Sequence, residues 1–251
     1  MGLDGKLALV TGASRPHGIG RATALALARA GADVVVTGLH NMDGANSLAQ
    51  EIASMGRRSK ALKVDATDYG DVKKGFAEVK AELGPVDILV NNAALMNHNV
   101  TIAKTTIEEW DYEVKLCLNS AFYCVKEAWA DMCSRGWGRI VNITSVAGAL
   151  GGYGQTSYGA AKAGLIGLAK SIALEGARFN ITANCVMVGI SQTDAAAKLP
   201  EPVLERVEKR TAIGRAAKPE EIADAVLFAV SSPYMTGAVV NMLGGLDLFV
   251  F

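Results

Sequence analysis

Short apolar runs alternate with longer helical stretches along the whole of this 251-residue sequence. The runs are apolar at consecutive positions, as in Val34-Val35-Val36, which is typical of parallel strands covered on both faces. Strands and helices that alternate with right-handed crossovers fold into one parallel sheet flanked by helices. We therefore predict the α/β class: a three-layer, doubly wound parallel sheet of about seven strands, in a single domain covering residues 1–251.

The pattern predicts strands over 6–11, 33–37, 61–64, 86–91, 139–144, 181–186 and 239–242. It predicts helices over 18–30, 41–55, 71–83, 107–134, 157–178 and 219–230. The least regular long segment, 189–214, follows the sixth strand, and ligands bind at the carboxyl ends of strands in such sheets. A long connection at that place predicts a lid over the substrate.

Composition excludes several classes of function. Lys and Arg number 25 and Asp and Glu number 25, so no net charge favours nucleic acid or an anionic membrane. No apolar run approaches the length of a membrane span. The four cysteines form no CxxC pair and the three histidines show no metal-ligand spacing, so we expect no metal. Reduced thiols and the lack of a secretory signal predict a cytoplasmic protein.

A glycine-rich segment, Thr11–Gly20, lies between the first predicted strand and the first predicted helix. Glycine lets a backbone turn tightly and approach a pyrophosphate, which the N–H groups of the following helix would bind. A glycine cluster alone is equally consistent with a simple tight turn. Its position after the first buried strand favours a dinucleotide site.

Other polar residues lie at the ends of predicted strands and on one face of a predicted helix. Asn91-Asn92-Ala93-Ala94 ends the fourth strand, Ser145 ends the fifth, and Tyr158 and Lys162 lie four apart on one helix face. Together with the glycine loop, their order and spacing resemble the short-chain dehydrogenase/reductase family over essentially the whole chain. The resemblance implies a Rossmann-type fold and an NAD(P)-dependent oxidoreductase that interconverts a secondary alcohol and a ketone.

The resemblance also implies which residues contact the dinucleotide. By this resemblance, Asp65 would contact the adenine ring, Thr193 would hold the nicotinamide amide, and Lys162 would bind the ribose hydroxyls. Asp65 is otherwise readily explained as a turn or cap residue. The full predicted cofactor set is Gly12, Ser14, Arg15, Gly18, Ile19, Gly20, Asp65, Ala66, Asn91, Ala93, Tyr158, Lys162, Gly189 and Thr193.

The chain departs from the family pattern at three places. Five residues separate Gly12 from Gly18, two more than is usual, so the extra residues must bulge outward. Ala94 replaces a glycine, and Val188 replaces a proline before Gly189. None of these changes removes a group that does chemistry.

The choice between NAD and NADP depends on the end of the second strand. An acidic residue there would bind the ribose diol and repel a 2′-phosphate, but this chain has Gly38. Arg15, His17 and His40 are available to a phosphate, although no arginine directly follows the strand. The lack of an acidic residue at the end of the second strand slightly favours NADP over NAD.

Hydride transfer needs a group that exchanges the hydroxyl proton, and Tyr158 is the predicted acid/base. A free phenol has a pKa of about 10, and an ammonium about 5 Å away would lower it by roughly two units. Lys162 is placed to do this, and Ser145 would hydrogen-bond the substrate oxygen. Asn119 resembles the residue that holds a water and connects Lys162 to solvent. Each residue alone is more simply explained by packing, so the prediction depends on their joint occurrence.

The substrate and partners are less constrained. A mostly apolar lining predicts a small-molecule substrate with a hydrophobic body; a β-hydroxyacyl or 3-oxoacyl thioester is one candidate, because 3-oxoacyl reductase-like members share this architecture. The predicted lining residues are Leu95, Met96, Leu150, Tyr153 and Met187. The apolar end, 246–251, and the resemblance predict a homo-oligomer, a dimer or a tetramer.

A second class of function stays open at this point. The chain would also suit a non-catalytic dinucleotide-binding subunit or sensor, because one fold hosts many functions. The altered glycine loop is the feature that favours this alternative. The joint presence of Asn119, Ser145, Tyr158 and Lys162 favours an enzyme.

Overall fold

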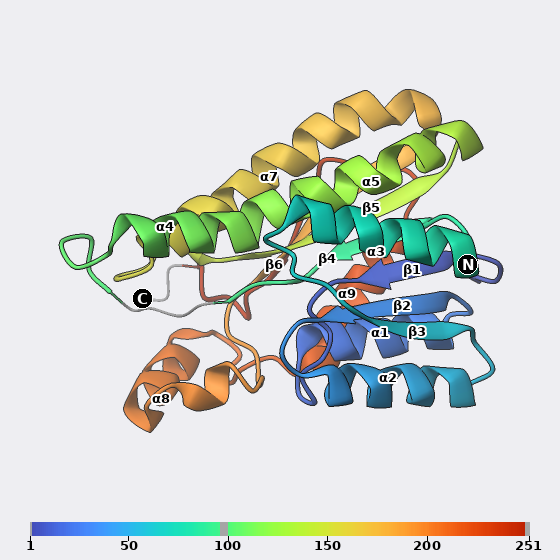
Figure 1. Ribbon diagram of the computed structural model, residues 1–251. Helices are drawn as coiled ribbons and strands as arrows, with labels where there is room; N and C mark the ends of the chain where they lie inside the picture. The colour runs from blue at the N-terminus through green and yellow to red at the C-terminus, as the bar shows by residue number, and fades with distance from the viewer. Residues whose placement is uncertain (1, 96–99, 249–251) are drawn as a thin grey trace.

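The computed structural model describes residues 2–95 and 100–248. Its centre is a seven-stranded sheet in the order β3-β2-β1-β4-β5-β6-β7, with every neighbouring pair parallel (Figure 1). The predicted three-layer, doubly wound fold is thereby confirmed. The strands are β1 Leu7–Val10, β2 Asp33–Gly38, β3 Ser59–Lys63, β4 Ile88–Asn91, β5 Gly138–Ser145, β6 Ile181–Val188 and β7 Val239–Met242.

Helices cover both faces of the sheet (Figure 1). One apolar core joins the sheet to α1 (Ile19–Arg29), α2 (Met42–Ser54) and α9 (Pro219–Ser231). A second core joins the other face to α3 (Tyr69–Glu82), α5 (Ser120–Arg135) and α7 (Thr156–Gly176). Strand β1 serves both cores, because Ala8 and Val10 pack into the first and Leu7 and Leu9 into the second. This explains why its sequence is apolar without alternation.

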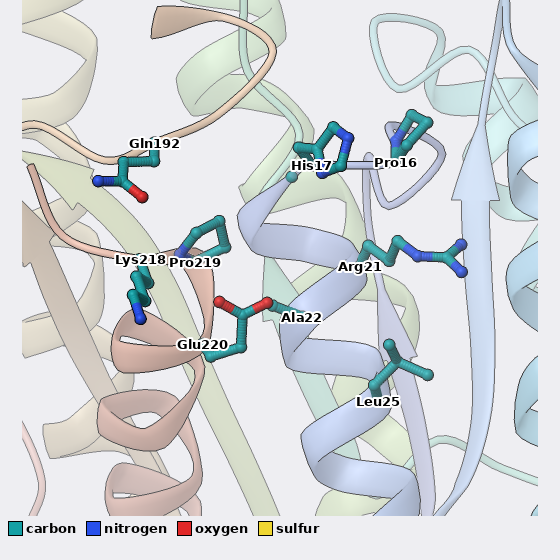
Figure 2. A pocket seen from close by; sticks show the side chains of 10 residues that line it. Pro16, His17, Arg21, Ala22, Leu25, Gln192, Lys218, Pro219 and Glu220 are labelled. Atoms are coloured by element: carbon teal, nitrogen blue, oxygen red, sulfur yellow. The ribbon is translucent and has the colours of Figure 1, made fainter.

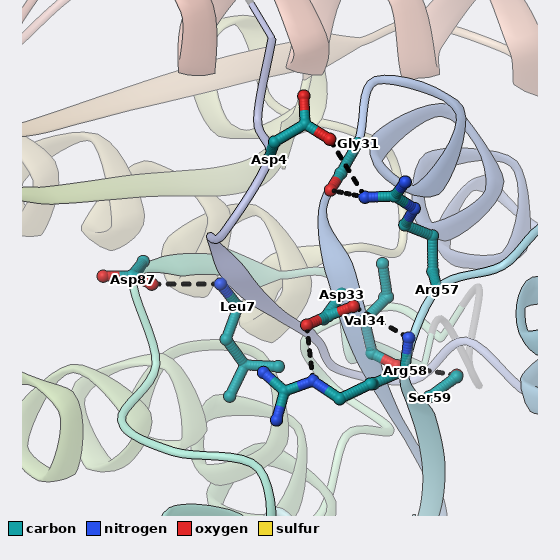
Figure 3. A network of polar contacts seen from close by, with 9 residues as sticks. All are labelled: Asp4, Leu7, Gly31, Asp33, Val34, Arg57, Arg58, Ser59 and Asp87. Carbon is teal, nitrogen blue, oxygen red and sulfur yellow. Dashed lines mark hydrogen bonds and ion pairs between the residues drawn. The ribbon is translucent and has the colours of Figure 1, made fainter.

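Hydrogen bonds and ion pairs connect residues near the amino ends of the strands (Figure 3). Arg58 Nε lies 2.7 Å from Asp33 Oδ2 across β2 and β3, and Asp87 Oδ2 accepts from Leu7 N at 3.0 Å. Arg57 Nη1 donates to the carbonyl oxygen of Gly31 at 2.8 Å. Exposed ion pairs contribute little stability individually. Their role here is to set the register at the edge opposite the carboxyl ends of the strands.

The long helix predicted over 107–134 is divided in the structure. It consists of α4 (Ile107–Val114), a π-helical turn η1 (Lys115–Asn119) and α5. A π-turn inserts one residue per turn, so it changes the face on which every following side chain lies. Sequence periodicity at 3.6 residues does not reveal such an insertion.

The segment 189–214 contains more regular structure than the sequence indicated. A short 3-10 turn, η3 (Ala196–Lys198), precedes helix α8 (Glu201–Arg210), which lies apart from the sheet (Figure 1). Helix α8 has no fully buried residue, so its apolar signal is weak and it resembled a loop. The one-turn helix α6 (Ala147–Leu150) was also missed. Within the ranges that the structure describes, no helix has the length and apolar character needed to cross a membrane.

Candidate active site

The residues of interest meet at one edge of the sheet. The glycine loop follows β1, Asn91 ends β4, Ser145 ends β5, and Gly189 follows β6. Because these strands are parallel, their carboxyl ends lie at the same edge. The chain changes winding direction between β1 and β4, and ligands bind at such a switch point.

The glycine loop forms a cradle that side chains would fill. Gly12 has a φ of +64°, and a Cβ on it would lie 2.8 Å from Ala93 Cα. A Cβ on Gly20 would lie 2.5 Å from Asn92 Nδ2 and 2.9 Å from Ala13 Cα. Gly18 begins α1, and no side chain caps its first-turn N–H groups. Free N–H groups and the positive end of the helix dipole fit the pyrophosphate of a dinucleotide.

The end of β4 fixes this loop through Asn92. Asn92 Nδ2 donates to the carbonyl oxygens of Thr11 at 2.8 Å and Gly12 at 3.0 Å. Thr11 Oγ1 accepts from the backbone N–H groups of Asn92 and Ala93, both at 2.9 Å. Asn92 was not among the predicted site residues, although it holds the cradle in shape.

The side chain of Asn91, which is predicted to line the cofactor cleft, is buried in the sheet. Asn91 is 5% exposed, and its Nδ2 donates to Asn142 Oδ1 on β5 at 2.8 Å. Successive side chains of a strand point to opposite faces, so Asn91 and Asn92 have different environments. That alternation was the signal in the sequence that could have distinguished them.

The bulge in the glycine loop reaches the predicted lid. His17 N donates to Asp194 Oδ2 at 3.1 Å, and Asp194 N donates to the carbonyl oxygen of His17 at 3.2 Å. The extra residues are accommodated outward, as expected, and they join the cofactor loop to the segment that carries Thr193.

A cavity of about 260 Å³ is lined by residues of the glycine loop, of α1 and of the start of α9. Figure 2 shows the side chains around it. Its polar lining is His17, Arg21, Gln192, Lys218 and Glu220. Ser145, Tyr158 and Lys162 do not line it, so it is separate from the predicted catalytic groups.

The structure brings Ser145, Tyr158 and Lys162 together where β5 meets α7. Ser145 hydrogen-bonds Tyr158, and its Oγ also accepts from Ala147 N at 3.2 Å. Lys162 is 2% exposed and its Nζ donates to the carbonyl oxygen of Ile143 at 2.7 Å. Thr144 Oγ1 donates to the carbonyl oxygen of Lys162 at 2.7 Å, which fastens the strand end to the helix. Thr144 therefore serves packing, and Ser145 faces Tyr158.

The electrostatics of Tyr158 and Lys162 differ from the expectation that the pKa of Tyr158 is lowered. Burial raises the pKa of Tyr158 above its ordinary value, electrostatic interactions with Cys117 and, to a smaller extent, with Glu113 raise it further, and the hydrogen bond from Ser145 opposes this. Burial lowers the pKa of Lys162. Its Nζ lies 5.6 Å from the Tyr158 ring centre and donates to the carbonyl oxygen of Ile143. Burial of the phenol therefore opposes the lowering of its pKa that was expected from Lys162.

The structure places Cys117, rather than Asn119, beside this pair. The buried Cys117 thiol donates to the carbonyl oxygen of Leu95 at 3.8 Å and interacts electrostatically with both Tyr158 and Lys162. Asn119 is half-buried at the end of η1, and none of the contacts of Lys162 in the described chain involves it. The water-mediated relay through Asn119 stays a prediction. Glu113 and Cys117 lie four residues apart and are both buried, and this spacing was the signal in the sequence that Cys117 faces the interior.

The remaining cofactor residues are placed as follows. Asp65 Oδ1 accepts from Thr67 N at 2.9 Å and from Thr67 Oγ1 at 2.7 Å, so Asp65 does make a turn. Its contact with adenine stays a prediction. Thr193 Oγ1 accepts from Ala196 N at 3.2 Å, which leaves the hydroxyl proton available to a carboxamide oxygen.

The predicted substrate residues have different degrees of exposure. Tyr153 is 87% exposed and Leu150 is 65% exposed, and Leu95 is half-buried. Met187 is 5% exposed and pairs in register with Thr144, so it belongs to the packing under α7 and offers little surface to a substrate. Met96 lies outside the described residues. In the described ranges, no group of three His, Cys, Asp or Glu side chains suits a metal ion.

Comparisons with known proteins find relatives over almost the whole chain. The sequence model of a family described as Enoyl-(Acyl carrier protein) reductase matches residues 12–247. The chain is 37% identical over 247 residues to the 3-oxoacyl-(acyl-carrier-protein) reductase FabG of Aquifex aeolicus, covering 97% of this chain and 98% of that protein. It is 40% identical over 243 residues to an acetoacetyl-CoA reductase of Rhizobium meliloti, covering 96% and 98%.

A similar fold occurs in a solved structure. A crystal structure assigned to a short-chain alcohol dehydrogenase from Sinorhizobium meliloti superimposes with a TM-score of 0.93 at 33% identity. The match covers 99% of both chains. The similarity therefore extends over the whole sheet and its helices.

Proposed function

The chain belongs to the short-chain dehydrogenase/reductase family, and on this premise we propose that it reduces the 3-oxo group of an acyl thioester with NADPH. Membership makes the protein an NAD(P)-dependent oxidoreductase. The observation that carries the proposal is the meeting of Ser145, Tyr158 and Lys162 beside the glycine cradle. Because all three are together, the alternative of a non-catalytic subunit is not favoured.

A bound nicotinamide supplies the hydride that is added to the carbonyl carbon. Tyr158 donates its phenolic proton to the carbonyl oxygen, so the ketone becomes a secondary alcohol and the phenol becomes a phenolate. Ser145 hydrogen-bonds the same oxygen while negative charge develops on it. The Lys162 ammonium then favours the phenolate until a proton from solvent restores the phenol.

Two observations support the thioester class. The relatives reported above are named for 3-oxoacyl carrier-protein and acetoacetyl-CoA substrates. The predicted substrate residues Leu95, which is half-buried, and Leu150, which is exposed, are apolar, which suits an acyl chain. The segment 189–214, with α8, is the proposed lid, and its contact with His17 would couple closure to the cofactor loop.

The preference for NADPH is supported by the end of β2. Gly38 offers no carboxylate to repel a 2′-phosphate. A Cβ on Gly38 would lie 2.9 Å from Ser14 Cβ, so the loop that carries Arg15 packs directly against this strand end. His40 is exposed two residues further on.

The experiment that tests the function follows nicotinamide absorbance with purified protein. We expect acetoacetyl-CoA and longer 3-oxoacyl thioesters to be reduced, with a higher kcat/KM for NADPH than for NADH. Simple cyclic ketones of similar size are the control substrates. Reduction of the ketones but not of the thioesters would reject the substrate class and leave the family chemistry standing.

The pH dependence of ketone reduction follows from the raised pKa of Tyr158. Reduction needs the protonated phenol, so its kcat/KM should stay constant through neutral pH and fall only when the pH rises above the ordinary range of a tyrosine. Oxidation of the alcohol needs the phenolate and should increase with pH throughout. Rates measured in both directions from pH 6 to pH 10 check this; a fall of reduction near pH 7 would contradict it.

We further propose a homo-oligomer, a dimer or a tetramer, in a reducing cytoplasm. Several large apolar side chains are exposed on neighbouring helices, and Trp110, Tyr112 and Phe122 lie on α4 and α5. Contiguous exposed apolar surface is typical of subunit contacts. All four cysteines are free thiols, which suits a reducing compartment.

A further inference from the structure

Two side chains fix the first half of the glycine loop. The Asn92 contacts described above hold the backbone at Gly12. Asn41, at the start of α2, donates from Nδ2 to the carbonyl oxygen of Ser14 at 2.8 Å. The first half of the loop is therefore tied to the end of β4 and to α2, and neither side chain reaches residues 15–18.

Asp194 holds the second half of the loop. Its Oδ2 accepts from His17 N at 3.1 Å, and its own N–H donates to the carbonyl oxygen of His17 at 3.2 Å. Within the described ranges, these are the only hydrogen bonds between the glycine loop, 11–20, and the segment 189–214. A bond to a carboxylate is stronger than one between neutral groups. The peptide directly before Gly18, where α1 begins, is thus fixed from the predicted lid.

The base of the lid is fixed separately. Gln192 N donates to the carbonyl oxygen of Ala217 at 2.8 Å, and Ala217 N donates to that of Ile190 at 3.0 Å. These bonds anchor the two ends of the lid on each other, whereas α8 further along has no fully buried residue. The contact of Asp194 with the glycine loop lies two residues beyond this base, so it constrains how the chain leaves the base toward η3 and α8.

The same contact lies between the two parts of the proposed dinucleotide site. Gly18 begins the helix whose free N–H groups suit the pyrophosphate, and Thr193, which is predicted to hold the nicotinamide amide, is the neighbour of Asp194. A ligand that orders the glycine loop also favours the bonded position of Asp194. Coupling between two sites is reciprocal, so a lid held in that position favours the loop conformation that binds.

We propose that Asp194 is a positioning residue for the dinucleotide: through its bonds to His17 it couples the pyrophosphate cradle to the lid, so that a ligand in the cradle holds the lid in place. His17 belongs to the bulge by which this loop exceeds the usual length, so the longer loop provides the contact. The inference deepens the proposed function and rests on its dinucleotide site, but it does not depend on a thioester substrate.

The first test follows the lid without turnover and without a nicotinamide. The probe is 2′-phospho-ADP-ribose, which has the pyrophosphate of NADPH but no group that reaches Thr193. Trypsin cleavage after Lys198, an exposed residue at the end of η3, measures opening of the lid. At a saturating concentration, verified by calorimetry, we expect the probe to slow this cleavage about tenfold in the wild-type protein and less than about twofold in Asp194→Ala.

Two further variants separate the hydrogen bond from a general loss of charge. Asp194→Asn keeps a side-chain oxygen for His17 N and should retain most of the protection. Asp224→Ala removes an exposed carboxylate from α9 and should behave as wild type. Equal protection in Asp194→Ala and wild type would overturn the inference. A wild-type protein that does not bind the probe, or binds it without slower cleavage, would overturn it as well.

The second test is the dissociation constant of NADPH, measured by fluorescence. It should rise about tenfold in Asp194→Ala, because loop and lid are no longer organised before binding, and stay within about threefold of wild type in Asp194→Asn. In thioester reduction, the KM for NADPH should rise in Asp194→Ala while kcat changes by less than about threefold.

A loss of kcat in Asp194→Ala with an unchanged dissociation constant would contradict the positioning role. If the wild-type protein reduces no thioester, the proposed function fails, but proteolysis and NADPH binding still decide the role of Asp194.

Discussion

Replacing Tyr158 by phenylalanine is expected to lower kcat for ketone reduction by about 10²- to 10⁴-fold, because the reaction loses its proton donor. The fold should be unchanged, since the substitution removes one hydroxyl whose described partner is Ser145. Affinity for the dinucleotide should change little, because the glycine cradle is formed by other elements. Steady-state kinetics and titration of cofactor binding measure the two effects separately.

Tyr234→Phe is the matched control for this variant. Tyr234 is fully exposed, lies outside the predicted site and has the same side-chain chemistry. It should retain wild-type kcat. Full turnover in Tyr158→Phe, or an equal loss in Tyr234→Phe, would remove the basis for assigning the proton transfer to Tyr158.

Lys162→Met is expected to have opposite effects on activity and on stability. The variant loses the charge that favours the phenolate, so kcat should fall by at least about 10²-fold. The free energy of unfolding should not fall by more than about 1 kcal/mol, because relief from burying an unpaired ammonium offsets the lost hydrogen bond to Ile143. Lys170→Met, at an exposed position of the same helix, should leave kcat unchanged.

The pH dependence of stability gives a further check on Lys162. Its pKa is lowered in the folded protein, so the ammonium destabilises the fold at low and neutral pH and ceases to do so above the ordinary lysine pKa. The stability of Lys162→Met relative to wild type should therefore decrease as the pH rises. Urea unfolding at pH 6, 8 and 10 measures this difference. A strongly destabilised variant at pH 6 would show that Lys162 is a structural residue.

Much of the fold was predictable because it depends on short-range patterns. Runs such as Val34–Val36 have no polar position, which is possible only in a strand covered on both sides. The glycine loop and the Tyr158–Lys162 spacing are also local, since each lies within one turn or one helix. These features predicted the sheet, the edge at which the site lies and the groups that meet there.

The contacts that the sequence did not predict depend on the phase of an element or on distant segments. Asn91 and Asn92 are adjacent in sequence, yet only Asn92 binds the glycine loop, because a strand sends successive side chains to opposite faces. The π-turn before α5 was not visible in the sequence, and in the structure Cys117, not Asn119, is the residue beside Lys162. A change of one position in phase moves a different side chain into the site.

The sequence by itself determined the doubly wound sheet through its periodicity, and its resemblance to the family indicated the glycine cradle and the trio of Ser145, Tyr158 and Lys162. Only the tertiary structure decided the direction in which the site shifts the pKa of Tyr158. The burial of Tyr158 and the Lys162 contact with Ile143 depend on helices packing against strand ends far away in the chain. Electrostatic energies depend on distances and burial in space, and a linear order of residues contains neither.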